Sequence, residues 1–208
     1  MATGLEQVLE RSRELVRADR HPENLALLHE ALDEHPGEPE IALRAAVAYY
    51  GEDEDEAERL ARRAVALSPE NPAVLMRAAS MMLNLGRVDD ALDWSRQARD
   101  RADPDFPLVF DLAHLVGKIA LAREEPEVAE RLLRLAFDHQ PESFGHGRYL
   151  ASLLESQGRR EEALEVVDEA LVHSSDDSDL EALGIGLRLI LFGPDTLPPG
   201  TTFTHTAD

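Results

Sequence analysis

Histidine, lysine and the acidic side chains are the groups in this sequence that could move protons or bind a metal. His21 and His29 are eight positions apart, which is not a usual metal-ligand spacing. His114 and Lys118 are four positions apart and would share a helix face. An acid–base role is conceivable for this pair, but a ligand contact or a solvated pair is favoured. The motifs of serine hydrolases, P-loop proteins and zinc proteases are absent, so we expect no catalytic residue, no metal and no cofactor.

The chain is strongly acidic, with a formal net charge of −21. This charge repels phosphate backbones, so we expect no nucleic-acid partner. Six of the seven residues from Glu52 to Glu58 are acidic. We favour a helix N-terminus for this cluster, because acidic side chains there complement the helix dipole. A site for a cation or a basic peptide is the alternative.

Composition favours a helical, water-soluble protein. Ala, Leu, Glu and Arg dominate, and these side chains lose little rotamer freedom in a helix. The sequence has no cysteine, no apolar run of membrane-spanning length and no signal-peptide pattern at its start. We therefore expect a cytoplasmic protein with no membrane partner. The ratio of 20 arginines to one lysine is compatible with a GC-rich bacterial genome.

Small residues recur along the chain at an interval of 34 positions. The recurring alanines are Ala45, Ala57, Ala64, Ala79, Ala91 and Ala98 in one block, and Ala129, Ala136, Ala163 and Ala170 in another. Two antiparallel helices approach closely only where facing residues are small, so a fixed alanine sets their crossing. Large residues such as Leu60, Leu67, Leu135 and Leu164 would then fill the grooves between neighbouring helices. Gly86 and Gly158 would supply the left-handed residue between paired helices.

Three stretches of this pattern resemble the tetratricopeptide repeat. The clearest is 71–98, in which Ala79, Gly86, Ala91 and Ala98 fall on the family's small-residue positions. The stretches 147–170 and 41–69 match in the same way, whereas the units around 5–36 and 110–141 match less well. The resemblance implies an all-α, right-handed α-α superhelical solenoid of about five helix pairs.

We expect one repeat domain over residues 1–193, followed by a tail at 194–208 that is rich in Pro, Gly and Thr. The predicted units are 4–36, 38–69, 72–104, 107–141 and 143–175. A C-terminal capping helix at 177–192 should cover the last pair with Leu180, Leu183, Leu187, Ile190 and Leu191.

In this family the first helix of each pair lines a concave surface that binds partners. Mapping the family's positions onto this sequence predicts a peptide-binding groove. Its residues would be Arg13, Arg17, Tyr49, Tyr50, Arg77, Asn84, His114, Lys118 and Arg148. This row is predominantly basic, and arginine forms bidentate hydrogen bonds with carboxylates. Solvated helix faces paired with neighbouring acids are the alternative interpretation.

The resemblance therefore implies a non-catalytic protein-protein interaction module, acting as an adaptor, a scaffold or a chaperone-like protein. Its partner would be another protein or a peptide, and the basic row favours an acidic one. The alternative is a structural role in which the chain forms a homo-oligomer through convex or terminal helices, with Trp94 as one candidate contact.

Overall fold

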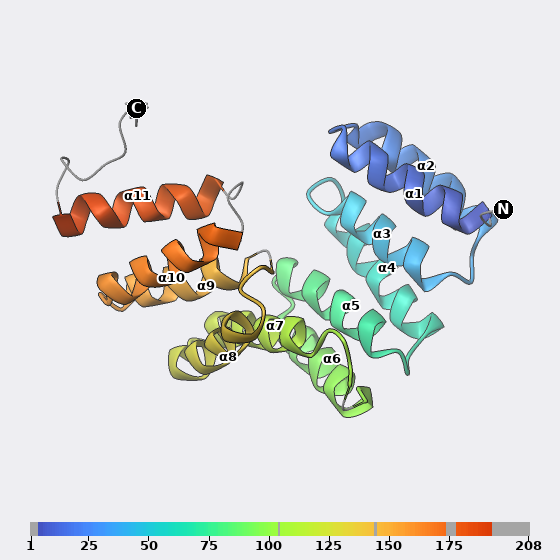
Figure 1. Cartoon of the computed structure of the whole chain (residues 1–208). Coiled ribbons are helices and arrows are strands. Elements are labelled where there is room, and N and C mark those ends of the chain that lie inside the picture. The colour runs from blue at the N-terminus through green and yellow to red at the C-terminus, as the bar shows by residue number, and fades with distance from the viewer. Residues whose placement is uncertain (1–3, 104, 144, 174–177, 193–208) are drawn as a thin grey trace. The chain divides into compact units, whose positions relative to one another are not determined.

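The computed structural model describes residues 4–103, 105–143, 145–173 and 178–192, and within these ranges the chain forms eleven α-helices and no strand (Figure 1). The first seven are α1 (Gly4–Arg17), α2 (His21–Glu34), α3 (Pro39–Tyr49), α4 (Glu54–Leu67), α5 (Pro72–Asn84), α6 (Val88–Arg101) and α7 (Val109–Ala122). The other four are α8 (Pro126–His139), α9 (His146–Ser156), α10 (Arg160–His173) and α11 (Ser178–Phe192). The all-α class predicted from the sequence is confirmed. The predicted tail at 194–208 lies outside the described residues.

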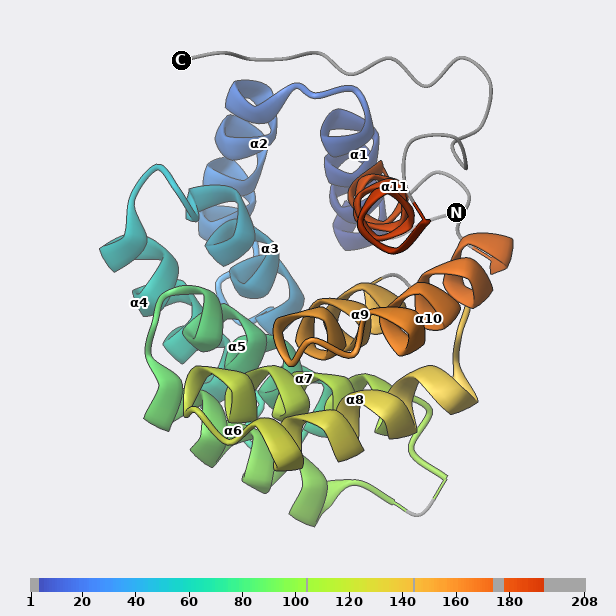
Figure 2. The same ribbon diagram turned by 90° about the vertical axis from the view of Figure 1, so that its left-hand side faces the viewer.

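The chain divides into two compact units, Met1–Arg123 and Glu124–Asp208. The boundary falls between α7 and α8, the two helices of the fourth predicted pair. In the first unit each helix packs against the next one, as Figure 2 shows for α1 and α2. In addition, α3 lies beside α5, and α5 lies beside α7. The first helices of the second, third and fourth pairs, α3, α5 and α7, therefore lie side by side.

The ends of the helices follow from side chains that satisfy free backbone N–H groups. The Asp53 carboxylate accepts a hydrogen bond from the Glu56 N–H at 3.0 Å and so caps α4. The acidic cluster is thus a helix N-terminus, as predicted. The Asn71 side chain caps α5 in the same way, ahead of Pro72. Gly86 and Gly158 have φ angles of +71° and +79°, which confirms the left-handed turns expected there.

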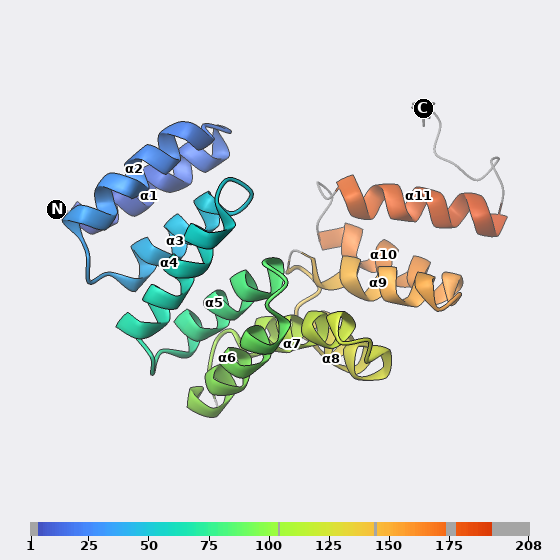
Figure 3. The ribbon, with the colours of Figure 1, turned by 180° about the vertical axis from the view of Figure 1, so that it is seen from behind.

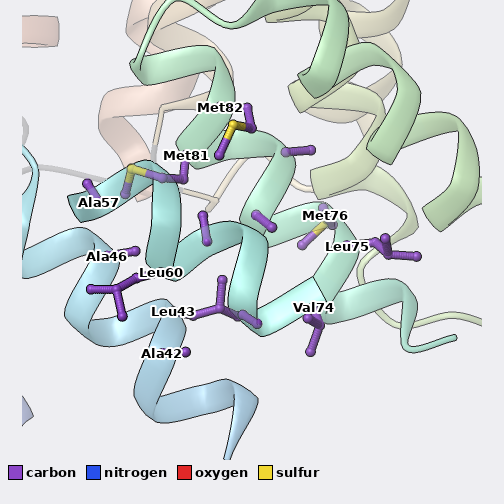
Figure 4. Packing of buried hydrophobic residues seen from close by; sticks show 14 of the residues in the cluster. Ala42, Leu43, Ala46, Ala57, Leu60, Val74, Leu75, Met76, Met81 and Met82 are labelled. Carbon is purple, nitrogen blue, oxygen red and sulfur yellow. The ribbon is translucent and has the colours of Figure 1, made fainter. Parts of the chain in front are cut away.

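The periodic alanines are buried, as close packing requires. Each of the ten is at most 3% exposed. Figure 4 shows part of the core of the first unit, a cluster of buried side chains that includes Leu43 of α3, Leu60 of α4, and Leu75 and Met82 of α5. Two of the leucines predicted to fill grooves are exposed instead, Leu67 at 39% and Leu135 at 42%. Leu135 follows the buried Leu133 by two positions, about 200° around α8, and so lies away from the packed face.

In the second unit, α11 packs on α9 and α10 (Figure 3). Leu187 is buried at 1% exposure, as predicted for the capping helix, but Ile190 is 57% exposed. The contact also runs through Gly184, where an added Cβ would lie 2.8 Å from Val167 Cγ1. Ile190 follows Gly184 by six positions, about 240° around α11, and so lies away from this contact. No helix in the described ranges is long and apolar enough to cross a membrane.

Candidate functional site

Four arginines from three helices line one hollow in the first unit. They are Arg13 and Arg17 on α1, Arg44 on α3 and Arg77 on α5. The hollow has a volume of about 350 Å³, and its other lining residues are Ser12, Val16, Asn24 and Val47. We call it the arginine hollow.

Helical periodicity places these side chains together. Arg13 and Arg17 are one helical turn apart on α1, and Arg44 precedes Val47 by three positions on α3. The packed face of α3 carries buried residues such as Ile41 and Ala45. Arg44 and Val47 lie outside this packed face and line the hollow.

Two further hollows continue the arginine hollow along the first unit. One, of about 480 Å³, shares Val16, Asn24 and Val47 with it and extends to Tyr50. The other, of about 170 Å³, is lined by Leu43, Val47, Arg77, Ser80 and Met81. Val47 lines all three hollows and is 62% exposed, and Val16 is 51% exposed. An exposed apolar strip thus runs beside the arginines.

Only two carboxylates in the described part of the chain pair with the four guanidinium groups. Glu40 lies 3.0 Å from Arg44 Nε and also bonds Arg77, which links α3 to α5. Glu10 lies 2.6 Å from Arg13. Arg17 is exposed and forms no ion pair with a described residue. The arginine hollow is therefore locally cationic within a chain of net charge −21.

Asn24 of α2 brings a buried amide to the same place. Asn24 as a whole residue is 4% exposed, and it is among the residues that line both the arginine hollow and the larger hollow beside it. Its Oδ1 atom has no hydrogen-bond partner among the described residues. Native structures leave few buried polar atoms unsatisfied, because each one costs about 1–3 kcal/mol.

Two models of the tetratricopeptide repeat family match the sequence, over residues 51–114 and 117–179, and together they cover more than half of the chain. The chain belongs to the tetratricopeptide repeat family. The fold class predicted from the sequence, a helical solenoid of repeated pairs, is that of this family.

Solved tetratricopeptide and related structures share the fold at low sequence identity. A thermophilic TPR protein of Thermus thermophilus, TTC0263, has a TM-score of 0.75 at 24% identity, with 88% of this chain and 98% of that chain covered. PilW, a type IV pilus biogenesis factor, has a TM-score of 0.75 at 18% identity, with 93% and 89% covered. Pseudomonas aeruginosa pilF has a TM-score of 0.70 at 18% identity, with 91% and 85% covered. No curated protein matches the sequence.

The structure gathers some of the residues predicted for the tetratricopeptide groove and separates others. Arg13, Arg17 and Arg77 meet in the arginine hollow. The Tyr50 hydroxyl donates to the Asn84 carbonyl at 3.4 Å. The remaining predicted residues lie elsewhere: Tyr49 packs on the core edge, His114 and Lys118 are half-buried on α7, and Arg148 lies over the Tyr149 ring in the second unit.

Five residues of the arginine hollow were not predicted for the groove: Ser12, Val16, Asn24, Arg44 and Val47. Asn24 carried a signal, since it precedes Leu28 by four positions and so occupies an apolar position of α2 with a polar side chain. No sequence signal indicated the exposure of Val16 and Val47, because an apolar residue on a helix is ordinarily assigned to the core. Within the described ranges, no group of three or more His, Asp or Glu side chains could hold a metal ion.

Proposed function

We propose that this chain is a non-catalytic interaction module and that the arginine hollow binds an acidic segment of another protein. The observation that carries the proposal is the excess of guanidinium groups over carboxylates in one hollow of an acidic chain. Arginine forms bidentate bonds with carboxylates, and a concave wall strengthens them by limiting solvent. Membership of the tetratricopeptide repeat family supports a protein partner in general.

Charge reversal on α1 tests this proposal with a built-in control. Arg13 and Arg11 each pair with a glutamate three positions away, at 2.6 and 2.8 Å, and each is about half exposed. Only Arg13 lines the hollow. Arg13→Glu and Arg17→Glu should each weaken binding about tenfold, because like charges then meet at the site. Arg11→Glu should leave binding unchanged.

Binding is measured by fluorescence polarisation with a labelled, end-blocked peptide of alternating aspartate and valine. The same peptide with lysine in place of aspartate should not bind. Equal loss of affinity in Arg11→Glu and Arg13→Glu would show that net charge, and not the hollow, governs binding.

Self-association is the second candidate function. Three large apolar side chains near the described ends of α10 and α11 are more than half exposed: Val172, Ile190 and Phe192. Trp94 supports it less, since the guanidinium carbon of Arg62 lies 5.7 Å from the centre of its half-buried ring. Light scattering decides this candidate, because a mass of 23.1 kDa at high concentration would reject it.

A further inference from the structure

The outer face of α11, the last described helix of the second unit, is apolar. Ala182, Gly186 and Ile190 follow one another at intervals of four positions and so share a helix face. Ala182 is exposed, Ile190 is 57% exposed, and nothing lies within 4 Å of a Cβ added at Gly186. Phe192, at the end of the helix, is 60% exposed. The helices α9 and α10 pack on the other side of α11, which carries Gly184 (Figures 1 and 3).

A helix at the end of a repeat array usually has a polar outer face, which keeps the array soluble. The outer face of α11 departs from this pattern, because Arg188 is the one charged residue from Ala182 to Phe192. Arg188 bonds Asp168 of α10 and so belongs to the packed side of the helix. A helix that is apolar on all sides is ordinarily buried on all sides. The outer face of α11 therefore requires a cover that α9 and α10 do not supply.

The chemistry of this face favours a cover that is apolar and nearly uncharged. An acidic segment would find no free guanidinium group on α11, since Arg188 is paired. A second copy of the chain is disfavoured, because two chains of net charge −21 repel each other. The tail at 194–208 has only two charged residues, both aspartates, and offers Leu197 and Phe203 as large apolar side chains.

The tail also begins at the right place and is long enough. It follows α11 after a single residue, Gly193. The helix has 15 residues and is about 22 Å long. The same number of residues in extended form spans up to about 50 Å, so the tail can run back along the whole of α11. Its three prolines have a fixed φ angle, which lowers the entropy lost on docking, and its attachment to α11 gives an effective concentration on the order of millimolar.

We infer that residues 194–208 pack on the outer face of α11 and complete the C-terminal cap of the fold. Leu197 and Phe203 occupy the open space at Gly186 and contact Ile190. This cover competes with self-association, the second candidate function, because both use the exposed side chains of Ile190 and Phe192. It does not involve the arginine hollow, so the inference and the binding of an acidic segment can fail separately.

Thiol labelling tests the inference on the full chain, which has no cysteine of its own. Gly186→Cys places a single thiol on the outer face, at a position with room for a Cβ. Its rate of reaction with a maleimide reports how often the face is uncovered. Leu197→Ser combined with Phe203→Ser should raise this rate about fivefold, because a tail without large apolar side chains leaves the face open. Thr202→Ser combined with Thr204→Ser is the matched control and should leave the rate unchanged.

Two further labels separate a cover on this face from a general effect. Ala182→Cys, one turn earlier on the same face, should show the same dependence on the tail. Glu165→Cys, at an exposed position of α10, should show none. Labelling of Gly186→Cys and Ala182→Cys that is equally fast with and without Leu197 and Phe203 would overturn the inference. Protection that grows with protein concentration would also overturn it and would assign the cover to a second copy of the chain.

Discussion

Each guanidinium group of the arginine hollow retains donors for a ligand. A guanidinium has five N–H donors, whereas Arg13, Arg44 and Arg77 each use a single bond to Glu10 or Glu40. Glu40 serves two of these arginines at once. The carboxylates therefore orient the arginines without neutralising them, as a site for anionic groups requires.

A second carboxylate bound by two arginines allows a prediction about pH. Glu58 of α4 accepts hydrogen bonds from Arg87 and from Arg62 at 2.9 Å, and these bonds hold its pKa below the ordinary value of 4.5. A carboxylate with a lowered pKa stabilises the folded state above pH 4.5, and this contribution is lost as the pH falls through the lowered pKa. Glu58→Gln should lower the thermal midpoint at pH 7, with a cost below about 1 kcal/mol because the pair is partly solvated.

The difference in thermal midpoint between wild type and Glu58→Gln should shrink as the solution is acidified below pH 4.5. Glu165→Gln is the control, since Glu165 is exposed and forms no ion pair with a described residue. A difference for Glu58→Gln that stays constant with pH would mean that the ion pairs with Arg62 and Arg87 contribute nothing.

At the scale of a helix, substitution by alanine should change the stability of the second unit in opposite directions at two glycines of α11. An added Cβ at Gly184 meets Val167 Cγ1 at 2.8 Å, whereas nothing lies within 4 Å of one at Gly186. Gly184→Ala should destabilise the second unit by about 1–3 kcal/mol through overpacking. Gly186→Ala should stabilise it by about 0.5–1 kcal/mol, because alanine loses less backbone entropy in a helix. Urea unfolding of both variants measures the two changes in the free energy of unfolding. Destabilisation in both variants would contradict the packing of α11 on α10.

The helices were predictable because their signals are local or periodic. Buried alanines, capping residues such as Asp53 and Asn71, and the glycine turns all act within a few positions or at the repeat interval. The fifth predicted unit begins at 143, whereas its first helix, α9, begins three residues later at His146. Gly145 has a φ of +88°, a left-handed conformation that an α-helix does not include.

The candidate site was predictable only in part, because a hollow depends on neighbours as well as on helix faces. Arg13, Arg17 and Arg77 followed from family positions on the first helices. Arg44 and Val47 occupy positions on α3 that the mapping did not include. Asn24 occupies an apolar position of α2, which indicates that it is buried, but the hollow that it lines depends on how α2 packs against its neighbours.

In the whole molecule, the negative net charge destabilises the folded state, whereas the positive charge of the arginine hollow favours binding of an acidic segment. The chain has 42 acidic and 21 basic residues, so its folded state is under net repulsion. Exposed ion pairs, of which it has many, each contribute only about 0–1 kcal/mol. The arginine hollow, in contrast, should attract an acidic segment against the repulsion of the rest of the chain.

Salt should therefore raise the thermal midpoint while it weakens binding. The Debye length falls from about 30 Å at 0.01 M salt to about 8 Å at 0.15 M, which screens both the repulsion and the attraction. Circular dichroism should show a higher thermal midpoint at the higher salt, and polarisation should show several-fold weaker binding of the aspartate–valine peptide. Sodium chloride is the appropriate salt, because sulfate stabilises proteins by exclusion from their surface. A thermal midpoint that falls with added chloride would show that ion pairs outweigh repulsion in this fold. Binding that strengthens with salt would instead show that contacts with Val16 and Val47, and not the guanidinium groups, hold the peptide.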